Sequence, residues 1–281
     1  METLNAGAPL LVFGASGPVG QFLLKRLGGQ GVSVMAVSRQ RPESTHPHVI
    51  WLQHDLNDSP VKVQASVLVS LGPLRHALEQ VEQSQRLGRV VALSSASTRF
   101  KAASPDAAER HLMAELIEIE RQLAEWCARR EIPLTLLKPT LIYGTADNQN
   151  VQRVAALGTR MRYLPYSGRG LRQPVHADDL ARFAIECLKR GQASAGSWWL
   201  GGGETLAYPD MLRRITAGTG QTPRLIRVPT IALKSLLRVM HWTGRMRDIR
   251  PVMIDRQKID LVVDDQPARE QLGWNPRPFR P

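Results

Sequence analysis

An apolar stretch followed by closely spaced glycines constrains the fold of this chain more than any other feature. Residues 10–20 read LLVFGASGPVG, and the following QFLLKRL has apolar residues at helical spacing. This order predicts a buried strand, a tight turn and a helix. Glycine lets the backbone approach a phosphate closely, and a helix start presents unpaired N–H groups. The residues expected to contact a dinucleotide here are Gly14, Ser16, Gly17, Pro18, Val19 and Gly20.

Further strand-like runs alternate with helical segments through the first half of the chain. They are LLVF (10–13), VSVMAV (32–37), VIWL (49–52), VLVSL (67–71), RVVALSS (89–95) and LTLLKP (134–139). Strands that are apolar on both faces and separated by helices are typical of a parallel sheet covered on each side. The predicted fold class is α/β, a Rossmann-like doubly wound parallel sheet with a smaller C-terminal substrate lobe.

The end of the second strand-like run indicates which dinucleotide is bound. Sites selective for NAD usually place an acidic residue there to bond the ribose hydroxyls. This chain reads VSRQRP, so Ser38, Arg39 and Arg41 offer a hydroxyl and two guanidinium groups, which suit a phosphate dianion. A basic loop facing solvent is the alternative. The predicted cofactor is NADP(H) in preference to NAD(H).

The alternation loosens after about residue 145, where Gly- and Pro-rich turns and Arg-rich helices follow. We therefore expect residues 1–145 to form mainly the NADP-binding core. Residues 146–281 are expected to form mainly the smaller substrate-binding lobe, over the carboxyl ends of the strands. Within that lobe, residues from about 174 to 200 are expected to return to the core sheet.

The chain is strongly basic, with a formal net charge of +12, and residues 224–258 hold nine Arg or Lys against two acids. Such charge suits nucleic acid or an anionic membrane. No nucleic-acid partner is predicted, because the sequence lacks helix-turn-helix, zinc-finger and aromatic RNA-binding signatures. A solvated face or a pocket for an anionic small-molecule substrate is the preferred interpretation, and a membrane surface or a protein partner is the alternative. A homodimer or an assembly partner stays open.

Cysteine usage and hydropathy give the remaining expectations. Cys127 and Cys187 each lie in an apolar helical pattern, so packing is favoured over a disulfide, and no metal site is predicted. No apolar run is long enough to span a bilayer, and METLNAGAPL lacks the features of a signal peptide. We therefore expect a soluble, cytoplasmic protein without a transmembrane segment.

Several motifs, taken in order, resemble the extended short-chain dehydrogenase/reductase superfamily in its NAD(P)-dependent epimerase/dehydratase branch. They are GASGPVG (14–20), HDL (54–56), LSSAS (93–97), LLKPTLIYG (136–144), PVHADDLA (174–181), WWLGGGETLAYPDML (198–212) and AREQLGW (268–274). The resemblance spans nearly the whole chain. It implies a Rossmann-type fold, a nicotinamide dinucleotide and oxidoreductase or isomerase chemistry.

The resemblance also implies roles for residues that follow the strands. Asp55 and Leu56 are similar to the pair that flanks the adenine, with Asp55 bonding its amino group; a helix N-cap is the alternative for Asp55. Leu71 and Gly72 are similar to the backbone over the adenosine ribose. The other expected cofactor contacts are Ser94, Ser95, Pro139 and Leu141, the last two beside the nicotinamide carboxamide.

The long amphipathic helix expected at residues 106–130 lacks the family's proton-transfer pair. The family places Tyr-x-x-x-Lys there, with the lysine lowering the tyrosine pKa and holding the ribose. Aligned on Glu120, this chain has Leu112 and Leu116 at those positions, and neither can transfer a proton. The apolar stripe expected to pack on the sheet is Leu112, Leu116, Ile119, Leu123 and Trp126.

Other residues are candidates for the missing chemistry. The family's usual serine position falls on Ala96, and the candidate catalytic residues are Ser95, Ser97, Thr98 and His111. Arg172, in GRGLRQPVH, stands where related epimerases have an arginine that binds the substrate diphosphate; a surface arginine is the alternative. His176 is expected to be structural, and Asp178 is as much a candidate helix cap as a functional group.

Two functions remain after these observations. The first is an atypical NADP(H)-binding oxidoreductase or isomerase without the usual Tyr-Lys pair. Its substrate would be anionic, with a nucleotide-linked compound as one candidate. The second is a non-catalytic NADPH-binding scaffold, sensor or assembly protein. The first is the preferred interpretation, and the second is the alternative.

Overall fold

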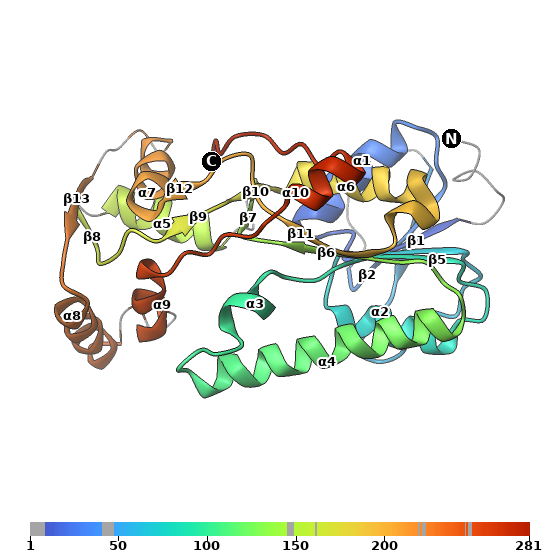
Figure 1. Ribbon diagram of the computed structural model, residues 1–281, viewed down its shortest axis with the longest axis horizontal. Helices are drawn as coiled ribbons and strands as arrows, with labels where there is room; N and C mark the ends of the chain where they lie inside the picture. Colours follow the sequence, from blue (N-terminus) through green and yellow to red (C-terminus); the bar gives the residue numbers. More distant parts are fainter. Residues whose placement is uncertain are drawn as a thin grey trace.

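A seven-stranded parallel sheet forms the centre of the computed structural model, which describes residues 9–40, 48–144, 149–160, 162–218, 220, 223–244, 246 and 249–281. The strand order is β11-β6-β5-β4-β1-β2-β3 (Figure 1). The strands are β1 (Leu10–Phe13), β2 (Val34–Ser38), β3 (Val49–Gln53), β4 (Val67–Ser70), β5 (Arg89–Leu93), β6 (Leu134–Pro139) and β11 (Gly196–Leu200). The predicted Rossmann-like α/β fold is confirmed.

Helices cover both faces of this sheet, and β1 shows how the faces are divided. Leu10 and Val12 join the apolar cluster under α1 (Pro18–Gly28), α6 (Ala177–Arg190) and α10 (Gln266–Leu272). Leu11 and Phe13 join the cluster under α2 (Leu74–Gln83) and α4 (Ala107–Arg129). Successive side chains of a strand point to opposite faces, so a run that is apolar throughout needs both layers.

The long helix α4 begins where the sequence predicts, but its first turns are more exposed than expected. Asp106 is the N-cap, and its carboxylate accepts hydrogen bonds from the N–H groups of Ala108 (3.0 Å) and Glu109 (3.2 Å). The stripe from Leu116 to Trp126 packs on the sheet. Leu112 is 57% exposed, so its predicted place in the core is wrong. Figure 1 shows the reason, because the first turns of α4 extend beyond the sheet.

Most of the other elements gather toward one end of the molecule, on the left in Figure 1. Three two-stranded ladders there pair β10 with β7, β12 with β9 and β13 with β8. These elements are β7 (Ile142–Tyr143), α5 (Gln149–Arg160), β8 (Tyr163–Tyr166), β9 (Leu171–Arg172), β10 (Val175–His176), β12 (Leu206–Ala207), α7 (Tyr208–Ala217), β13 (Arg224–Arg227), α8 (Thr230–Trp242), α9 (Pro251–Asp255) and the 3-10 helix η3 (Arg256–Lys258). Two short helices lie elsewhere: α3 (Ser97–Lys101) packs on α4, and the 3-10 helix η2 (Gly191–Ser194) contacts the first residues of β6.

The second half of the chain also contributes to the core layers. Strand β11 pairs with β6 from Gly196 opposite Thr135 to Leu200 opposite Pro139. Helix α6 packs beside α1 on the same face of the sheet. Among the residues that the structure describes, no helix is both long and apolar enough to cross a membrane.

Candidate functional site

The glycine turn after β1 combines close packing with an open side. Gly14 has φ of 68°, and a Cβ there would lie 2.6 Å from the backbone N of Gly72. A Cβ on Gly20 would lie 2.2 Å from the carbonyl oxygen of Gly14. A Cβ on Gly17 would meet only that oxygen, at 3.2 Å. Gly14 and Gly20 are therefore required by the packing of the turn, whereas Gly17 faces open space.

The start of α1 beside this turn offers donors for an anion. Its N-cap, Gly17, supplies no side-chain hydrogen bond, Pro18 has no N–H, and the first turn holds no acidic residue. The first N–H groups of a helix lack intrahelical acceptors, and the helix dipole favours negative charge there. The open side at Gly17 and these free donors fit the pyrophosphate of a dinucleotide.

The ends of β2 and β3 lie together at the same edge of the sheet. The N–H of His54 donates to the carbonyl of Ser38 at 2.9 Å. Asp55 accepts hydrogen bonds from the backbone N and the side-chain amide of Asn57, both at Oδ1, and so caps a turn and not a helix. Those hydrogen bonds, with the nearby charge of Arg39, lower the pKa of Asp55. Arg41 lies outside the described residues.

The ends of β4, β5 and β6 continue this edge. The N–H of Leu71 donates to the carbonyl of Phe13 at 3.0 Å, which brings Leu71 and Gly72 against the glycine turn. The N–H of Ala96 donates to the carbonyl of Pro139 at 2.9 Å. The described residues predicted to bind the cofactor thus follow one edge of the sheet, the carboxyl ends of its parallel strands. Their contact with a cofactor stays a prediction.

The candidate catalytic residues after β5 are partly engaged in local hydrogen bonds. Ser95 Oγ accepts from the N–H of Ser97 at 3.1 Å, and Thr98 Oγ1 donates to the carbonyl of Ser95 at 3.0 Å. Thr98 is buried, whereas Ser95 and Ser97 are half-buried. His111 is exposed on the first turns of α4. Ser95 and Ser97 therefore keep hydroxyl protons that these two contacts do not use.

A buried ion pair near these serines was not expected from the sequence. Lys138 Nζ lies 2.7 Å from Glu120 Oε2, and Ser94 Oγ donates to Glu120 Oε1. The ammonium group also lies 4.9 Å from the ring centre of Trp199. The pair joins α4 to the ends of β5 and β6. The available signal was a lysine inside the apolar strand LTLLKP, because a buried charge needs an opposite partner.

A second charged cluster connects α4 to the basic C-terminal stretch. Arg256 Nη2 contacts both carboxylate oxygens of Glu109, at 2.6 and 2.7 Å. Arg250 Nη2 lies 3.0 Å from Glu109 Oε1. Burial disfavours ionisation of Glu109, but hydrogen bonds from Ser104 and Arg256 outweigh it and lower the pKa. Burial also lowers the pKa of the nearby Lys101. Part of the basic stretch is therefore neutralised inside the protein.

Arg172 lies between β9 and the C-terminal segments and is largely buried. Its Nη1 donates to the carbonyls of Leu171 (2.7 Å) and Ile259 (2.8 Å), and Nη2 donates to that of Arg256 (2.7 Å). Burial lowers the pKa of Arg172 to about 10, so it stays cationic near neutral pH. The predicted contact with a substrate anion would have to use the donors that these carbonyls leave free.

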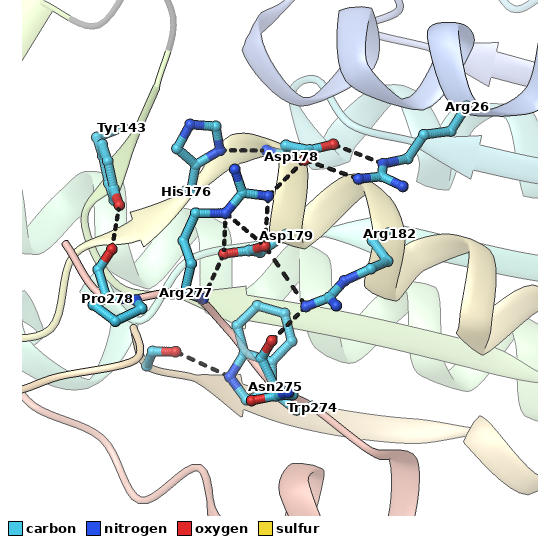
Figure 2. A network of polar contacts seen from close by, with 11 residues as sticks. Arg26, Tyr143, His176, Asp178, Asp179, Arg182, Trp274, Asn275, Arg277 and Pro278 are labelled. Carbon is cyan, nitrogen blue, oxygen red and sulfur yellow. Dashed lines mark hydrogen bonds and ion pairs between the residues drawn. The ribbon is translucent and has the colours of Figure 1, made fainter. Parts of the chain in front are cut away.

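The PVHADDLA motif forms a clamp between α1, α6 and the C-terminal segment (Figure 2). His176 Nδ1 accepts the N–H of Asp178 at 3.0 Å, so His176 is the N-cap of α6. The helix cap considered for Asp178 therefore belongs to His176. Asp178 pairs instead with Arg26 Nε (2.6 Å) and Arg277 Nη2 (2.6 Å). Both acids of this motif are therefore used in ion pairs within the protein.

A hollow of about 530 Å³ lies at the opposite edge of the sheet. It is lined by Cys127 near the end of α4, Leu134 at the start of β6 and Gly196 at the start of β11. Because all strands are parallel, this edge carries their amino ends. The hollow is therefore separate from the glycine turn and from every predicted site residue.

Comparison with known proteins gives weak sequence similarity. No family model matches the chain. It is 21% identical to UDP-glucose 4-epimerase of Vibrio cholerae over 161 residues, 57% of this chain and 47% of that protein. It is 25% identical to the uncharacterized oxidoreductase YesF of Bacillus subtilis over 223 residues, 76% of this chain and 72% of that protein. The chain thus matches only about half the length of the epimerase.

Solved structures are similar over nearly the full chain. The UDP-N-acetylglucosamine 4-epimerase of Bacillus cereus superposes with a TM-score of 0.68 at 13% identity, covering 97% of this chain and 92% of that one. The UDP-glucuronic acid 4-epimerase of B. cereus, in complex with NAD, gives 0.69 at 14% identity, with 96% and 94% covered. MoeE5, in complex with UDP-glucuronic acid and NAD, gives 0.69 at 19% identity and the same coverage.

These similarities identify the fold. The chain has the same Rossmann-like fold as these UDP-sugar epimerases, a parallel sheet with helices on both faces, as its apolar runs and glycine turn predict. Identity below one fifth to these structures shows the architecture alone, and function has to be argued from the site itself.

Proposed function

We propose that the protein binds NADP(H) along the carboxyl edge of its sheet and acts as an atypical oxidoreductase or epimerase on an anionic substrate. The observation that carries the proposal is the cradle at Gly14, Gly17 and Gly20, where free helix N–H groups face an open side. Two of the structurally similar proteins are complexes with NAD, which supports a nicotinamide dinucleotide as the cofactor.

Each part of the dinucleotide has a candidate partner along this edge. The N–H groups of Val19 and Gly20 would hold the pyrophosphate. Arg39, exposed at the end of β2 with no acid beside it on that strand, would bind the 2′-phosphate together with Arg41. Asp55 would accept the adenine amino group through Oδ2, because Asn57 occupies Oδ1. Near the nicotinamide the candidates are Ser94, Ser95, Pro139 and Leu141.

The nicotinamide, when bound, supplies hydride exchange with a substrate carbon, and the chain must manage the proton at the neighbouring oxygen. Leu112 and Leu116 offer no proton. Ser95 and Ser97 keep hydroxyl groups that could bond that oxygen, and His111 would have to come within about 3 Å of it to take part. Thr98 is a weaker candidate, because its proton is donated to the Ser95 carbonyl.

The substrate class follows from the same reasoning. Arg172 is a buried cation with no carboxylate partner among the described residues, and its carbonyl contacts leave part of the guanidinium free. MoeE5 has been solved with UDP-glucuronic acid and with UDP-glucose. A nucleotide-linked sugar is therefore the proposed anionic substrate. An Arg172→Lys variant should raise the substrate KM more than it lowers kcat if the contact exists.

The cofactor proposal is tested by calorimetric titration with NADPH and NADH. The parent should bind NADPH more tightly. Arg39→Ala should lose about tenfold to a hundredfold of NADPH affinity, because one charge-assisted contact is worth about 1.5 to 3 kcal/mol. NADH affinity should stay unchanged. Arg86→Ala is the matched control, since Arg86 is exposed near the opposite edge. Equal affinity of the parent for both cofactors would refute the NADP preference.

A second function is favoured by the leucines at the predicted Tyr and Lys positions. Leu112 is exposed and cannot donate a proton, which suits a non-catalytic NADPH-binding scaffold or sensor. Bound NADPH whose absorbance never changes across a panel of carbonyl compounds and UDP-sugars would support this role. Parent turnover that survives separate loss of His111, Ser97 and Thr98 would show that the alignment misplaces the catalytic acid.

A further inference from the structure

Helix α8 is attached to the lobe by one face only. Leu233 and Leu237 are buried against Ile254 of α9, with further apolar residues of the lobe around them. Lys234 Nζ lies 2.6 Å from Asp255 Oδ2 and fixes the same side. The helix is therefore held in place without any contribution from its outer face.

The outer face of α8 is apolar and uncovered. Its exposed residues include Ile231 (82% exposed), Leu236 (50%), Val239 (58%) and Trp242 (89%). At 3.6 residues per turn Ile231, Val239 and Trp242 share the side of the helix that is turned away from Leu233 and Leu237, and Leu236 lies at the border of that side. Single exposed apolar residues are common, but a row that ends in a nearly fully exposed tryptophan marks an interaction surface.

The charge that stays exposed around this face is basic. Residues 224–258 hold nine Arg or Lys and two acids, Asp248 and Asp255. Lys234 is paired with Asp255, and Arg250 and Arg256 are paired with Glu109. Arg224, Arg227 and Arg238 are exposed, and among the described residues none of the three forms an ion pair. A cationic border around an apolar row fits a partner that is apolar inside and anionic at its surface.

We propose that the outer face of α8 binds the surface of an anionic phospholipid bilayer. Ile231, Leu236 and Val239 would enter the boundary between headgroups and acyl chains, and Trp242 would lie at headgroup depth, where aromatic rings are favoured. Arg238 and the arginines of β13 would contact lipid phosphates. The binding is peripheral and does not depend on the proposed dinucleotide function.

Charge distinguishes this partner from two others. A second copy of the chain seated symmetrically on the same face would bring the exposed arginines of both copies together, with no acids to offset them. A nucleic acid would satisfy the arginines but leave Ile231, Val239 and Leu236 in water. A lipid surface satisfies both sets of groups.

Helix α8 lies far from the proposed dinucleotide site. In Figure 1, α8 lies at the far left end of the long axis, below β13, whereas β1 and β2 lie toward the other end. A bilayer that contacts the outer face of α8 therefore does not cover the edge that holds the glycine turn.

The proposal is tested by sedimentation of the full chain with sucrose-loaded vesicles. Vesicles of phosphatidylcholine alone are compared with vesicles containing about one third phosphatidylglycerol. We expect at least tenfold tighter binding to the anionic vesicles at low salt, because each cation near the surface contributes about fivefold in affinity. Raising the salt should weaken the binding.

Two variants of the face and one control complete the experiment. Trp242→Ala combined with Ile231→Ser should weaken binding to anionic vesicles at least tenfold, and Arg238→Glu should do the same. Ile50→Ser is the matched control, because Ile50 is 65% exposed on β3. In the parent, brominated lipids should quench part of the tryptophan fluorescence, and Trp242→Phe should abolish that part. Circular dichroism confirms that each variant is folded.

Three results would overturn the proposal. The parent could fail to bind anionic vesicles at low salt. The double variant could be folded and bind them as tightly as the parent. Sedimentation without vesicles could show a dimer that the double variant dissociates, while vesicles bind neither protein; the face would then contact a second copy.

Discussion

Helices α6 and α8 have similar lengths, 14 and 13 residues, and apolar residues on more than one side, yet they are covered very differently. Most residues of α6 are buried, between α1 and the sheet, and its acids Asp178 and Asp179 are paired with arginines. In α8 only Leu233 and Leu237 are buried. An apolar pattern therefore shows what a helix can bury, whereas its place in the fold decides what it does bury.

The same contrast separates the two ends of the molecule. Around α6, charged side chains are used within the protein, as the clamp in Figure 2 shows. Around α8, by contrast, Arg224, Arg227 and Arg238 form no ion pair among the described residues, and the apolar side chains of its outer face are exposed. Substitutions near the core should therefore cost stability, whereas substitutions on the outer face of α8 should change binding alone.

The largest expected effect is at the glycine turn. In Gly20→Ala the new Cβ would lie 2.2 Å from the Gly14 carbonyl oxygen, and the backbone on both sides is held by β1 and α1. We expect a loss of about 3 kcal/mol or more in the free energy of unfolding. Gly17→Ala is the control, because its Cβ meets one atom at 3.2 Å. It should keep the fold and weaken dinucleotide binding, as urea unfolding and NADPH titration can measure.

A pair of leucines in α8 tests the contrast within one helix. Leu237→Ala should cost about 2 to 3 kcal/mol in unfolding free energy, because it leaves a cavity beside Ile254. Leu236→Ala should change that free energy by less than about 0.5 kcal/mol, because Leu236 is half exposed. Equal losses in the two variants would mean that the outer face is covered within the protein.

The fold was predictable because its signals are local. The apolar runs at 10–13, 49–52 and 134–139 became strands with nearly those bounds, and Asp106 marked the start of α4. Leu112 was misassigned because periodicity shows which side of a helix is apolar but not how far the helix extends beyond the sheet. Where a helix extends beyond the sheet, and which element packs against it, are set by the tertiary structure and not by the local sequence.

The ion pairs of the site were not predictable for the same reason. Glu109 and Arg256 are 147 residues apart, and nothing in either segment names the other as its partner. The serine and glycine loops were easier, because parallel strands bring their carboxyl ends to one edge whatever the side chains are. Which dinucleotide those loops bind depends on charged side chains such as Arg39, and the titrations with NADPH and NADH measure that preference.

A smaller effect is expected at the clamp between α6 and the C-terminal segment. Asp179 is 2% exposed and accepts hydrogen bonds from the backbone N and the guanidinium of Arg277. Asp179→Ala would leave that buried N–H without an acceptor and should cost about 2 kcal/mol. Asp210→Ala, which breaks an exposed pair with Arg213, should cost less than about 0.5 kcal/mol. Urea denaturation of both variants gives the two free energies of unfolding. If Asp179→Ala leaves that free energy unchanged, the clamp does not stabilise the fold.

The smallest expected effect is a dependence on pH at Asp178. Hydrogen bonds from Arg26, then Arg277, lower the pKa of Asp178 from its ordinary value of 3.8 to about 2. The ionised form is therefore more stable in the folded protein than in the unfolded chain. This contribution is complete above about pH 4 and is lost as the pH falls through about 2.

We expect the contribution to be about 1 kcal/mol, because Asp178 is only partly buried. The measurement is the unfolding free energy of the parent minus that of Asp178→Asn, taken at pH values between about 5 and 2. Taking this difference removes the contribution of groups that do not interact with Asp178. His176 is coupled to it, because burial lowers the pKa of His176 and the charge of Asp178 partly opposes that shift. The difference should shrink toward acid pH. A constant difference would mean that Arg26 and Arg277 contact Asp178 without favouring its ionised form.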